Sequence, residues 1–437
     1  RRAGAPGRPG VSALTPARTI HRFPQGFLWG ASTSSHQVEG NNVWNDWWAS
    51  EQAGELPYRS GQACRHYELF EHDFDLARSL GQNAHRLSIE WSRIEPAEGA
   101  WSEEAIAHYA NVMDALRARN LEPIVTLHHF TNPAWFSRRG GWTRRDSPRL
   151  FARYVARVVQ TLGSRVKYWL TINEPTVYVV QGWVLGEWPP FSKSAWGTAT
   201  RVFVNLARAH RAAYREIHRG WPDAMVGFAH SGQLIAACDP ARISDRLAAR
   251  LRDLLLNHGF FSLIGGRGGL RSPALDFIGL NYYYRTIVQS AGSGLQRLIG
   301  RTCDAPHHDR GPISDMGWEV HPAGLTSMLR KYARYGLPIL ITENGIATED
   351  EKLRRDFIAS HLRSLATAVA DGVNVFGYCY WSLIDNFEWA HGTRPRFGLA
   401  AVDYDTQQRV PRPGAAYFAE VCRTNRLAES EGADAFS

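Results

Sequence analysis

The sequence predicts an α/β fold, a single (β/α)8 TIM barrel with long βα loops. The first observation is that eight short apolar, β-branched runs alternate with helix-like segments along the chain. The second is that polar residues gather just after several of these runs, which in such barrels lie at one rim. The third is length: 437 residues exceed the roughly 250 of a minimal barrel, so the surplus is expected in loops.

The eight runs are almost continuously apolar, which is typical of parallel strands buried on both faces. They are Phe27–Ala31, Ala84–Ile89, Pro123–His128, Tyr168–Asn173, Met225–His230, Asp276–Tyr283, Pro338–Thr342 and Val375–Trp381. Helical periodicity lies between them, at Tyr67–Leu80, Glu103–Arg119, Pro148–Leu162, Ala199–His218 and Arg354–Asp371. Strands that alternate with helices predict βαβ units and a parallel sheet.

The domain organisation expected from composition is simple. Residues 1–19 are rich in Arg, Gly and Pro and are interpreted as a disordered basic leader. Residues 20–425 are expected to form one (β/α)8 barrel, and residues 426–437 to be a frayed tail. The five cysteines (Cys64, Cys238, Cys303, Cys379 and Cys422) show neither metal spacing nor a disulfide framework, which favours a reducing, cytoplasmic location.

The net charge of +8 does not predict a nucleic-acid partner. Only four of the 50 basic residues are lysine, and the arginines are spread along the whole chain without a clustered basic stripe. No run of 18 or more apolar residues is present, so no membrane partner is expected either. The oligomeric state cannot be predicted from the sequence.

Two strings carry the chemistry: Thr171-Ile172-Asn173-Glu174-Pro175 and Ile341-Thr342-Glu343-Asn344-Gly345. Each places a glutamate at the end of a predicted strand, and therefore on the same rim of the barrel. Glycosidic bond cleavage needs such a pair, one carboxylic acid and one carboxylate. The alternative, two glutamates that only cap strand ends or form ion pairs, fits two such distinctive strings poorly. Pro175 biases Glu174 toward an extended backbone.

Other residues are expected to support this pair. Arg86 lies within an apolar strand and needs a buried carboxylate partner; we expect it to orient Glu343 and favour its charged form. Tyr283 can donate its hydroxyl to Glu343. Either residue could instead serve only the barrel core. Asn173 could bind a sugar hydroxyl or merely form a turn.

The string Trp381-Ser382-Leu383-Ile384-Asp385-Asn386-Phe387-Glu388-Trp389 predicts a sugar-binding wall. Tryptophan faces stack on sugar rings and a carboxylate can accept two adjacent hydroxyls. His128 and His129 follow the third strand, and adjacent strand residues point in opposite directions. One of the two is therefore expected to meet the sugar. No further ligands at metal spacing accompany them, so no metal is expected.

These motifs resemble glycoside hydrolase family 1, the β-glucosidase family, from Phe23-Pro24-Gln25-Gly26-Phe27-Leu28-Trp29-Gly30 to Arg396-Phe397-Gly398-Leu399 and beyond. The resemblance implies that Glu174 is the acid/base and Glu343 the nucleophile of a retaining exo-β-glycosidase. It implies no cofactor. The residues that it assigns to the glycone are Gln37, His128, Asn173, Glu388 and Trp389, with Trp381 as the stacking floor. Those around the nucleophile are Asn281, Tyr283 and Arg86; Trp318 lines the aglycone entrance and Phe397 supports the site.

The sequence departs from the family pattern at several places. Phe130 follows His129 where the family commonly has Trp, which affects the contact to the glycone 3-hydroxyl. The stretch Gly392–Arg396 lacks the usual aromatic residue. The regions Asp239–Pro273 and Gln289–His308 are short, which predicts a more open aglycone side. Glu388 is retained, and a carboxylate would repel a sugar 6-phosphate, so an unphosphorylated glycone is expected.

The expected substrate is a small β-glycoside or oligosaccharide with a terminal β-D-glucosyl residue, with galactosyl or fucosyl tolerated. Two alternatives remain. A transglycosylase would use the same covalent intermediate with a sugar or alcohol acceptor. A catalytically silent sugar-binding barrel would need neither glutamate, and both are present here.

Overall fold

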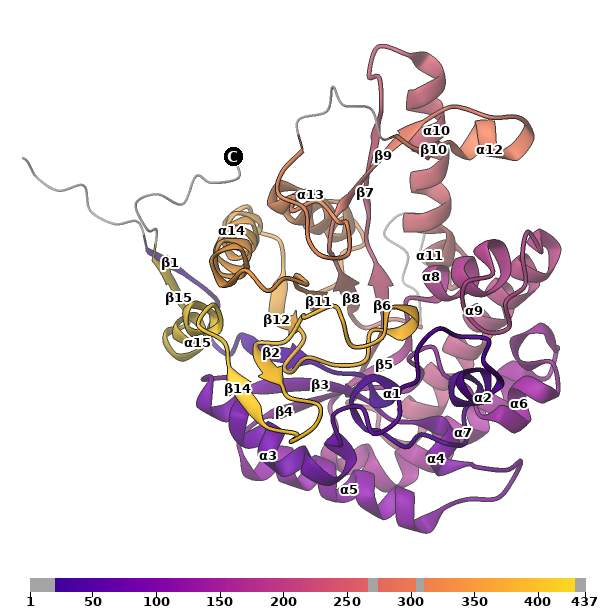
Figure 1. The fold of residues 1–437 in the computed structure, drawn as a ribbon, viewed down its shortest axis with the longest axis vertical. Helices are drawn as coiled ribbons and strands as arrows, with labels where there is room; N and C mark the ends of the chain where they lie inside the picture. Colours follow the sequence, from indigo (N-terminus) through magenta and orange to yellow (C-terminus); the bar gives the residue numbers. More distant parts are fainter. Residues whose placement is uncertain (1–19, 266–273, 304–309, 429–437) are drawn as a thin grey trace, which may run out of the picture.

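The computed structural model describes residues 20–265, 274–303 and 310–428. Its centre is a closed barrel of eight parallel strands, in the order β11-β12-β2-β3-β4-β5-β6-β8 (Figure 1). The strands are β2 (Leu28–Ser32), β3 (Ala84–Ser88), β4 (Glu122–Thr126), β5 (Tyr168–Asn173), β6 (Met225–Ser231), β8 (Ile278–Asn281), β11 (Ile339–Asn344) and β12 (Val375–Trp381). The predicted barrel is confirmed, and each strand overlaps its predicted run.

Helices cover the outside of the barrel (Figure 1). The long ones are α3 (His66–Ser79), α5 (Glu103–Ala118), α7 (Ser147–Leu162), α9 (Trp196–Gly220), α13 (Pro322–Ala333), α14 (Glu351–Ala370) and α15 (Ala415–Thr424). All five predicted helices are present. Their starts follow ordinary capping chemistry: Ser102 accepts a hydrogen bond from the Ala105 amide at the start of α5, and Asp350 caps α14 in the same way.

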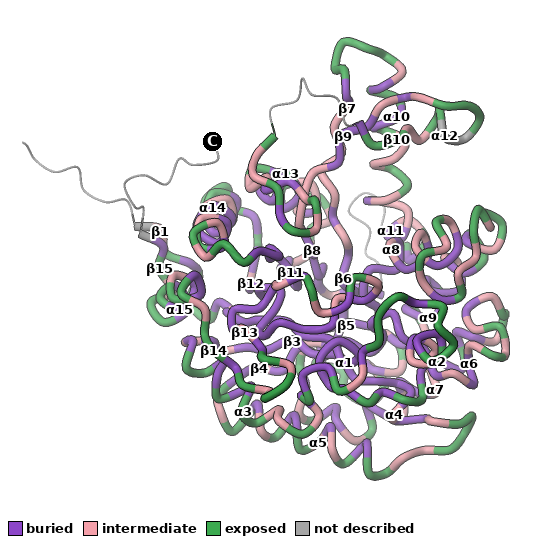
Figure 2. Tube along the Cα trace, in the orientation of Figure 1, coloured by how far each residue is buried: buried purple, intermediate pink, exposed green. Residues whose placement is uncertain are grey.

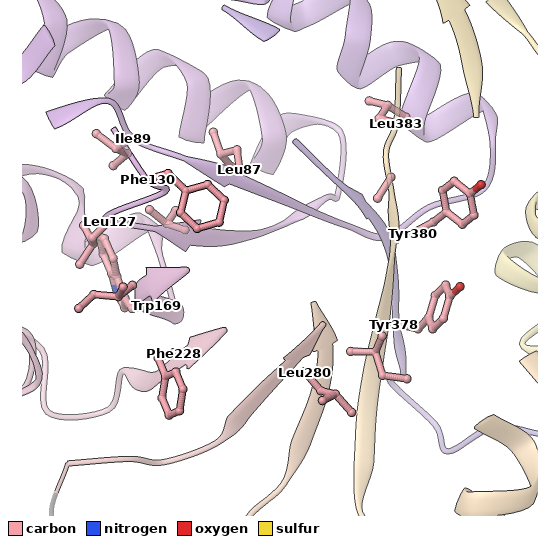
Figure 3. Close-up of a cluster of buried hydrophobic side chains, with 14 of the residues drawn as sticks. Leu87, Ile89, Leu127, Phe130, Trp169, Phe228, Leu280, Tyr378, Tyr380 and Leu383 are labelled. Atoms are coloured by element: carbon pink, nitrogen blue, oxygen red, sulfur yellow. The ribbon is translucent and has the colours of Figure 1, made fainter. Parts of the chain in front are cut away.

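The barrel strands lie in the buried part of the molecule (Figure 2), and two apolar layers hold them together. Inside it, small and large side chains fill the lumen: Ala84, Ile124, Leu170, Ala229, Phe277, Leu340 and Cys379. Outside it, the other faces of the strands pack against the helices. Figure 3 shows part of this outer layer, with Leu87, Leu127, Trp169, Phe228 and Tyr378 among its members. Burial on both faces explains why the strands lack polar alternation.

The βα loops hold short elements at the carboxyl-terminal rim: α1 (Ser35–Val38), α2 (Asp46–Ala53), α4 (Trp91–Ile94), α6 (Ala134–Arg138), α8 (Pro175–Val179), η1 (Gly141–Thr143), η3 (Val180–Leu185) and η5 (Trp389–His391). η2 (Gly163–Arg165) follows α7, and β13 (Ala400–Val402) pairs with β14 (Arg409–Pro411).

The largest excursion follows β6 and β8 and projects from the rim (Figure 1). It contains a three-stranded sheet of β7 (Leu234–Ala237), β9 (Arg285–Gln289) and β10 (Arg301–Thr302). Helical segments accompany it: α10 (Ile243–Asp253), η4 (Leu254–His258), α11 (Gly259–Leu263) and α12 (Gly294–Ile299). Residues 266–273 and 304–309 of the two stretches expected to be short lie outside the described residues.

Two expectations about the chain are corrected. Cys238 and Cys303 form a disulfide. They are 65 residues apart in sequence, and spacing gave no sign that the β7–β9–β10 sheet brings them together. The tail begins later than expected, because β15 (Arg426–Ala428) pairs with β1 (Ile20–Arg22). Residues 1–19 and 429–437, where the leader and most of the tail were expected, lie outside the described residues.

Candidate active site

Glu174 directly follows β5, and Glu343 is the penultimate residue of strand β11. The backbone of Glu174 is not extended, as the following proline suggested, but left-handed, with φ 40° and ψ 58°. Pro175 disfavours the right-handed helical conformation at Glu174, but it leaves the left-handed conformation available. Two backbone bonds hold Glu174 there: its N–H donates to the Ala229 carbonyl at 2.8 Å, and its carbonyl accepts from the Tyr178 N–H at 3.0 Å.

Glu343 is held by two donors. The guanidinium of Arg86 donates to Oε1 at 2.5 Å, and the hydroxyl of Tyr283 donates to Oε2 at 2.6 Å. Arg86 is fully buried in β3 and is fixed by further bonds to the Thr126 hydroxyl, the Thr342 carbonyl and Asn173 Oδ1. A charge-assisted pair of this kind stabilises the ionised carboxylate.

Glu174 has a different environment. Its contact is with an amide: Asn281 Nδ2 donates to Oε1 at 2.9 Å, and the same amide donates to Asn173 Oδ1 at 3.2 Å. Burial and, next, the negative charge of Glu343 raise the pKa of Glu174 from 4.5 to about 8. A group with this pKa holds its proton at neutral pH. The two carboxyl groups are therefore differentiated, with one held by a cation and the other kept protonated.

The segment after β12 supplies the proposed sugar wall. Gln37 Nε2 donates to Glu388 Oε2 at 3.1 Å and to Asn386 Oδ1 at 3.0 Å. Ser34 Oγ donates to the oxygen of the Gln37 side chain, which fixes the orientation of its amide. Burial and the charge of Glu343 raise the pKa of Glu388 to about 8.

His129, and not His128, belongs to this site. The His129 ring lies nearly parallel to the rings of both Trp381 and Trp389, at centroid distances of 5.9 and 6.2 Å. The expectation for His128 is wrong: its ring packs edge-on against Trp142 and Tyr178 and bonds to Asn132. β4 ends at Thr126, so strict strand alternation no longer decides where the next side chains point.

The hydrogen bonds fix the tautomer of His129. Because Asn173 Oδ1 accepts from Arg86, its Nδ2 is the donor to His129 Nε2 at 3.2 Å. Burial, and next the charge of Arg86, lower the pKa of His129 well below 6.5, so the ring is neutral and Nδ1 carries the proton. Nδ1 is buried and has no partner among the described residues, which leaves a donor for a sugar hydroxyl.

An aromatic group lies beside the nucleophile on the other side. Tyr283, Trp318 and Phe397 pack together with Trp381 and the buried Ala347. The Trp318 ring lies 5.2 Å from that of Tyr283 and is only partly buried. The predicted entrance residue is thus adjacent to the tyrosine that contacts Glu343.

One buried arginine that supports these loops was missed. Arg354 on α14 is fully buried and donates to carbonyls of both loops that flank the site: Ile346 and Thr348 after β11, and Arg396 and Phe397 after β12. Its position in an ordinary helical pattern gave no signal. The loop after β11 also needs a glycine at position 345. A Cβ at Gly345 would lie 1.8 Å from the Trp381 carbonyl oxygen, so a side chain does not fit there.

A closed barrel with two differentiated carboxyl groups and a Trp–Glu–Trp wall at its carboxyl-terminal rim defines a barrel glycosidase. A sequence model described as Glycosyl hydrolase family 1 matches residues 19–271 and 269–427. The chain belongs to this family and is a glycoside hydrolase of the β-glucosidase type.

Relatives and solved structures agree with this assignment. Beta-glucosidase A of Thermotoga maritima is 30% identical, over 93% of this chain and 99% of its own. A beta-galactosidase of Pyrococcus woesei is 31% identical, over 92% of this chain and 97% of its own. The beta-glycosidase structure from Pyrococcus horikoshii has a TM-score of 0.88 and 42% identity, covering 94% and 97% of the two chains. The T. maritima beta-glucosidase in complex with glucoimidazole has a TM-score of 0.86 and 30% identity, covering 92% of this chain and 99% of its own.

In the described part of the chain, no group of three or more His, Cys, Asp or Glu side chains is placed to hold a metal ion. No helix among the described residues is long and apolar enough to cross a membrane.

Proposed function

We propose that the chain is a retaining exo-β-glycosidase that hydrolyses terminal non-reducing β-D-glucosyl residues, with Glu174 as acid/base and Glu343 as nucleophile. The observation that carries the proposal is the contrast between the two carboxyl groups. Glu343 has the Arg86 cation and the Tyr283 hydroxyl as donors, whereas Glu174 has a neutral amide and a pKa of about 8. Retention requires these two states at roughly 5–5.5 Å, which we expect here.

In the first step, a Glu343 oxygen attacks the anomeric carbon and the bond to the aglycone oxygen breaks. Glu174 transfers its proton to that oxygen, so the aglycone leaves neutral. The glycosyl group is then esterified to Glu343. The negative charge of Glu343 contributes to the raised pKa of Glu174. Once Glu343 is esterified, that charge is gone and the pKa of Glu174 falls. Glu174 is therefore ready to act as a base.

In the second step, Glu174 removes a proton from water, the water oxygen attacks the anomeric carbon, and the ester bond to Glu343 breaks. Both carboxyl groups return to their starting states. No step uses a metal or an organic cofactor. Two inversions at the same carbon give net retention.

The proposed glycone contacts follow from the donors and acceptors on the wall. Glu388 and Gln37 are joined by a hydrogen bond and together can bind neighbouring hydroxyls. His129 Nδ1 and Asn173 offer further polar contacts, and Trp381 offers a stacking face. Phe130 has no donor, and its ring lies 5.4 Å from that of Trp389, so hydroxyl recognition there depends on His129. Burial and the charge of Glu343 already oppose ionisation of Glu388, so the further negative charge of a sugar 6-phosphate would be disfavoured there.

The small-molecule substrate, an oligosaccharide or simple β-glycoside, is part of this proposal, and a galactosyl or fucosyl residue is the expected variation. A cytoplasmic location is also a proposal. The three free cysteines, Cys64, Cys379 and Cys422, are buried and give it no direct support. The Cys238–Cys303 disulfide counts against a strongly reducing compartment.

Turnover of p-nitrophenyl β-D-glucoside, the galactoside and the fucoside by the wild type and Glu343→Gln tests the proposal. We expect activity in the wild type and a loss of at least about 10³-fold in the variant. The transglycosylase alternative predicts a different product. With an added alcohol, even at low concentration, most of the released sugar would be transferred to the alcohol and not to water. Turnover of none of the three substrates would favour the silent sugar-binding barrel.

A further inference from the structure

His36 is a buried histidine of the loop after β2 that takes no part in the proposed mechanism. It lies in α1, directly before Gln37, and both of its ring nitrogens have partners. Asn45 Nδ2 lies 3.0 Å from Nδ1, and Glu51 Oε1 lies 3.0 Å from Nε2. Because Asn45 Oδ1 accepts from the Trp48 amide, Asn45 Nδ2 is a donor, and His36 Nδ1 accepts from it. Nε2 therefore carries the proton and donates to Glu51, so the orientation of the ring is fixed.

Glu51 holds this histidine to α2, which lies beside α1 (Figure 1). Its carboxylate is buried, and its second oxygen accepts from both the amide and the hydroxyl of Ser60, at 2.9 and 2.7 Å. A buried carboxylate needs every one of its donors, since a lost donor leaves a polar group unsatisfied. The His36 ring is thus held at both nitrogens by α2, through the N-cap residue Asn45 and through Glu51.

The ring of His36 also contacts the segment that forms the proposed sugar wall. It is nearly parallel to the Trp389 ring, at a centroid distance of 5.7 Å and an angle of 17°. It meets the Phe387 ring edge-on at 6.0 Å, and the Phe387 amide donates to the Gln37 carbonyl at 3.0 Å. The loop after β2 therefore holds the segment after β12 on both sides of Glu388.

Trp389 needs such support because its backbone is left-handed, with φ 48°. This conformation is uncommon for a bulky residue and persists only where the surroundings hold it. The Trp47 ring of α2 also packs against Trp389, at a centroid distance of 4.6 Å. α2 therefore supports Trp389 in two ways, directly through Trp47 and indirectly through the bond from His36 to Glu51.

The position of His36 bears on both hydroxyl-binding groups of the wall. Gln37 follows His36 directly and donates to Glu388. The residues on either side of Glu388 contact the His36 ring. A shift of this ring would therefore displace Gln37 and Glu388 together. The hydrogen bonds that the structure describes for His36 and Glu51 include neither catalytic carboxyl group, so this support concerns sugar binding and not the chemical step.

We propose that Glu51 and His36 are positioning residues that determine how tightly and how selectively the wall binds the glycone. This rests on the proposed β-glycosidase function and deepens it. Glu51 fixes the His36 ring, and the ring fixes the segment that carries Glu388. A looser wall should bind glucose less tightly and distinguish it less from galactose, since the two sugars differ only in the direction of one hydroxyl.

The test measures kcat and KM for p-nitrophenyl β-D-glucoside and β-D-galactoside in the wild type, His36→Phe, Glu51→Leu and Glu51→Gln. His36→Phe keeps a ring beside Trp389 and removes both hydrogen bonds, whereas Glu51→Gln keeps an acceptor for His36. His66→Phe is the matched control, because His66 is also buried and bonds to a buried carboxylate, that of Asp73 at 2.7 Å, but on α3. Glucose binding by titration calorimetry is a second measurement that does not depend on turnover.

We expect KM for the glucoside to rise at least about tenfold in His36→Phe and Glu51→Leu, with kcat within about threefold of the wild type. The affinity for glucose should fall by a similar factor, and the ratio of kcat/KM for the two glycosides should move toward one. Glu51→Gln should recover part of these changes. His66→Phe should leave KM and the ratio unchanged, even where it lowers the free energy of unfolding.

Wild-type values of KM, of the ratio and of glucose affinity in a folded His36→Phe protein would overturn the proposal, and so would equal changes in His66→Phe. If Glu51→Leu does not fold, His36→Phe and Glu51→Gln decide. Absence of wild-type turnover of both glycosides would instead overturn the proposed function, and glucose binding would then still test the role of His36. A wild type with neither turnover nor glucose binding would overturn both.

Discussion

Arg86 and Glu343 are 257 residues apart in sequence, yet the Arg86 guanidinium lies 2.5 Å from Glu343 Oε1. Arg86 points into the barrel from β3, and Glu343 reaches it from β11, with β12 and β2 between the two strands. Because both side chains are buried, the carboxylate interacts with the cation in a medium that screens it little. This relationship makes Glu343 the anionic member of the pair.

Removal of the Arg86 guanidinium should leave a Glu343 carboxyl oxygen without its charged donor. Arg86→Met is therefore expected to lower kcat/KM by at least about 10²-fold, because the attacking carboxylate is no longer held in place. The measurement is kcat/KM for an aryl β-glucoside. Arg86→Lys should restore part of the activity, since it retains the charge and a donor. An unchanged kcat/KM in a folded Arg86→Met protein would contradict this role.

The pKa of Glu174 predicts the alkaline limb. A general acid must be protonated, and the pKa of Glu174 is raised to about 8, so kcat/KM should be constant through neutral pH and fall as pH rises through about 8. Glu174→Gln removes the proton donor and should abolish this limb. Its loss of activity should be largest for aglycones that leave poorly and much smaller for 2,4-dinitrophenyl glucoside. A wild-type limb near pH 5 would show that Glu174 is not the acid.

The same shift predicts how stability depends on pH. Glu174 holds its proton in the native state up to about pH 8, whereas in the unfolded chain it loses it near 4.5. The native state therefore binds more protons between these values, and stability falls as pH rises, by up to about 1.4 kcal/mol per pH unit from this group. Relative to the wild type, Glu174→Gln should gain stability between pH 6 and 8 in urea unfolding. An equal pH dependence in both proteins would contradict the raised pKa.

The two neighbouring histidines should give different mutant phenotypes. His129→Ala removes a donor beside Trp381 and Trp389, and we expect kcat/KM to fall about 10²-fold. His128→Ala removes a ring packed against Trp142 and Tyr178, and we expect a much smaller fall in kcat/KM. Both rings are buried, so each variant should cost about 1–3 kcal/mol of stability. Urea unfolding and glucoside kinetics on both variants measure this. A larger fall in kcat/KM for His128→Ala than for His129→Ala would restore the original assignment of His128.

Arg354 is expected to position the loops on either side of the site. Arg354→Met would leave several buried carbonyls without donors and should lower the free energy of unfolding by about 3 kcal/mol or more. Below the unfolding transition, KM for the glucoside should rise more than kcat falls, because the segment that carries Glu388 and Trp389 loses its support. Arg354→Lys should recover part of both. A change in stability with unaltered KM would show that Arg354 is only structural.

The fold was predictable because each barrel strand is buried on both faces, so its apolar run is visible without knowledge of its neighbours. Arg86 and Tyr283 were also predictable, since a charge or hydroxyl in such a run needs a partner. The excursion that holds the Cys238–Cys303 disulfide was not, because it depends on how β7, β9 and α10 pack together. Strand alternation predicted only that one of His128 and His129 faces the sugar, and the family resemblance assigned His128; the structure instead packs His128 against Trp142 and Tyr178. The left-handed backbone of Glu174 depends on bonds to Ala229 and Tyr178, which local sequence does not specify.

The central claim, a double displacement through Glu343, is tested most directly by trapping the intermediate. A 2-deoxy-2-fluoro-β-D-glucosyl fluoride should react once and then turn over slowly, since the 2-fluorine slows both steps while the fluoride leaves easily. Mass spectrometry of the intact protein and of its peptic peptides would locate the sugar. The account predicts one fluoroglucosyl group on the peptide with Glu343, and none in Glu343→Gln. A label on another carboxylate, or rapid turnover without any adduct and with inversion at the anomeric carbon, would contradict it.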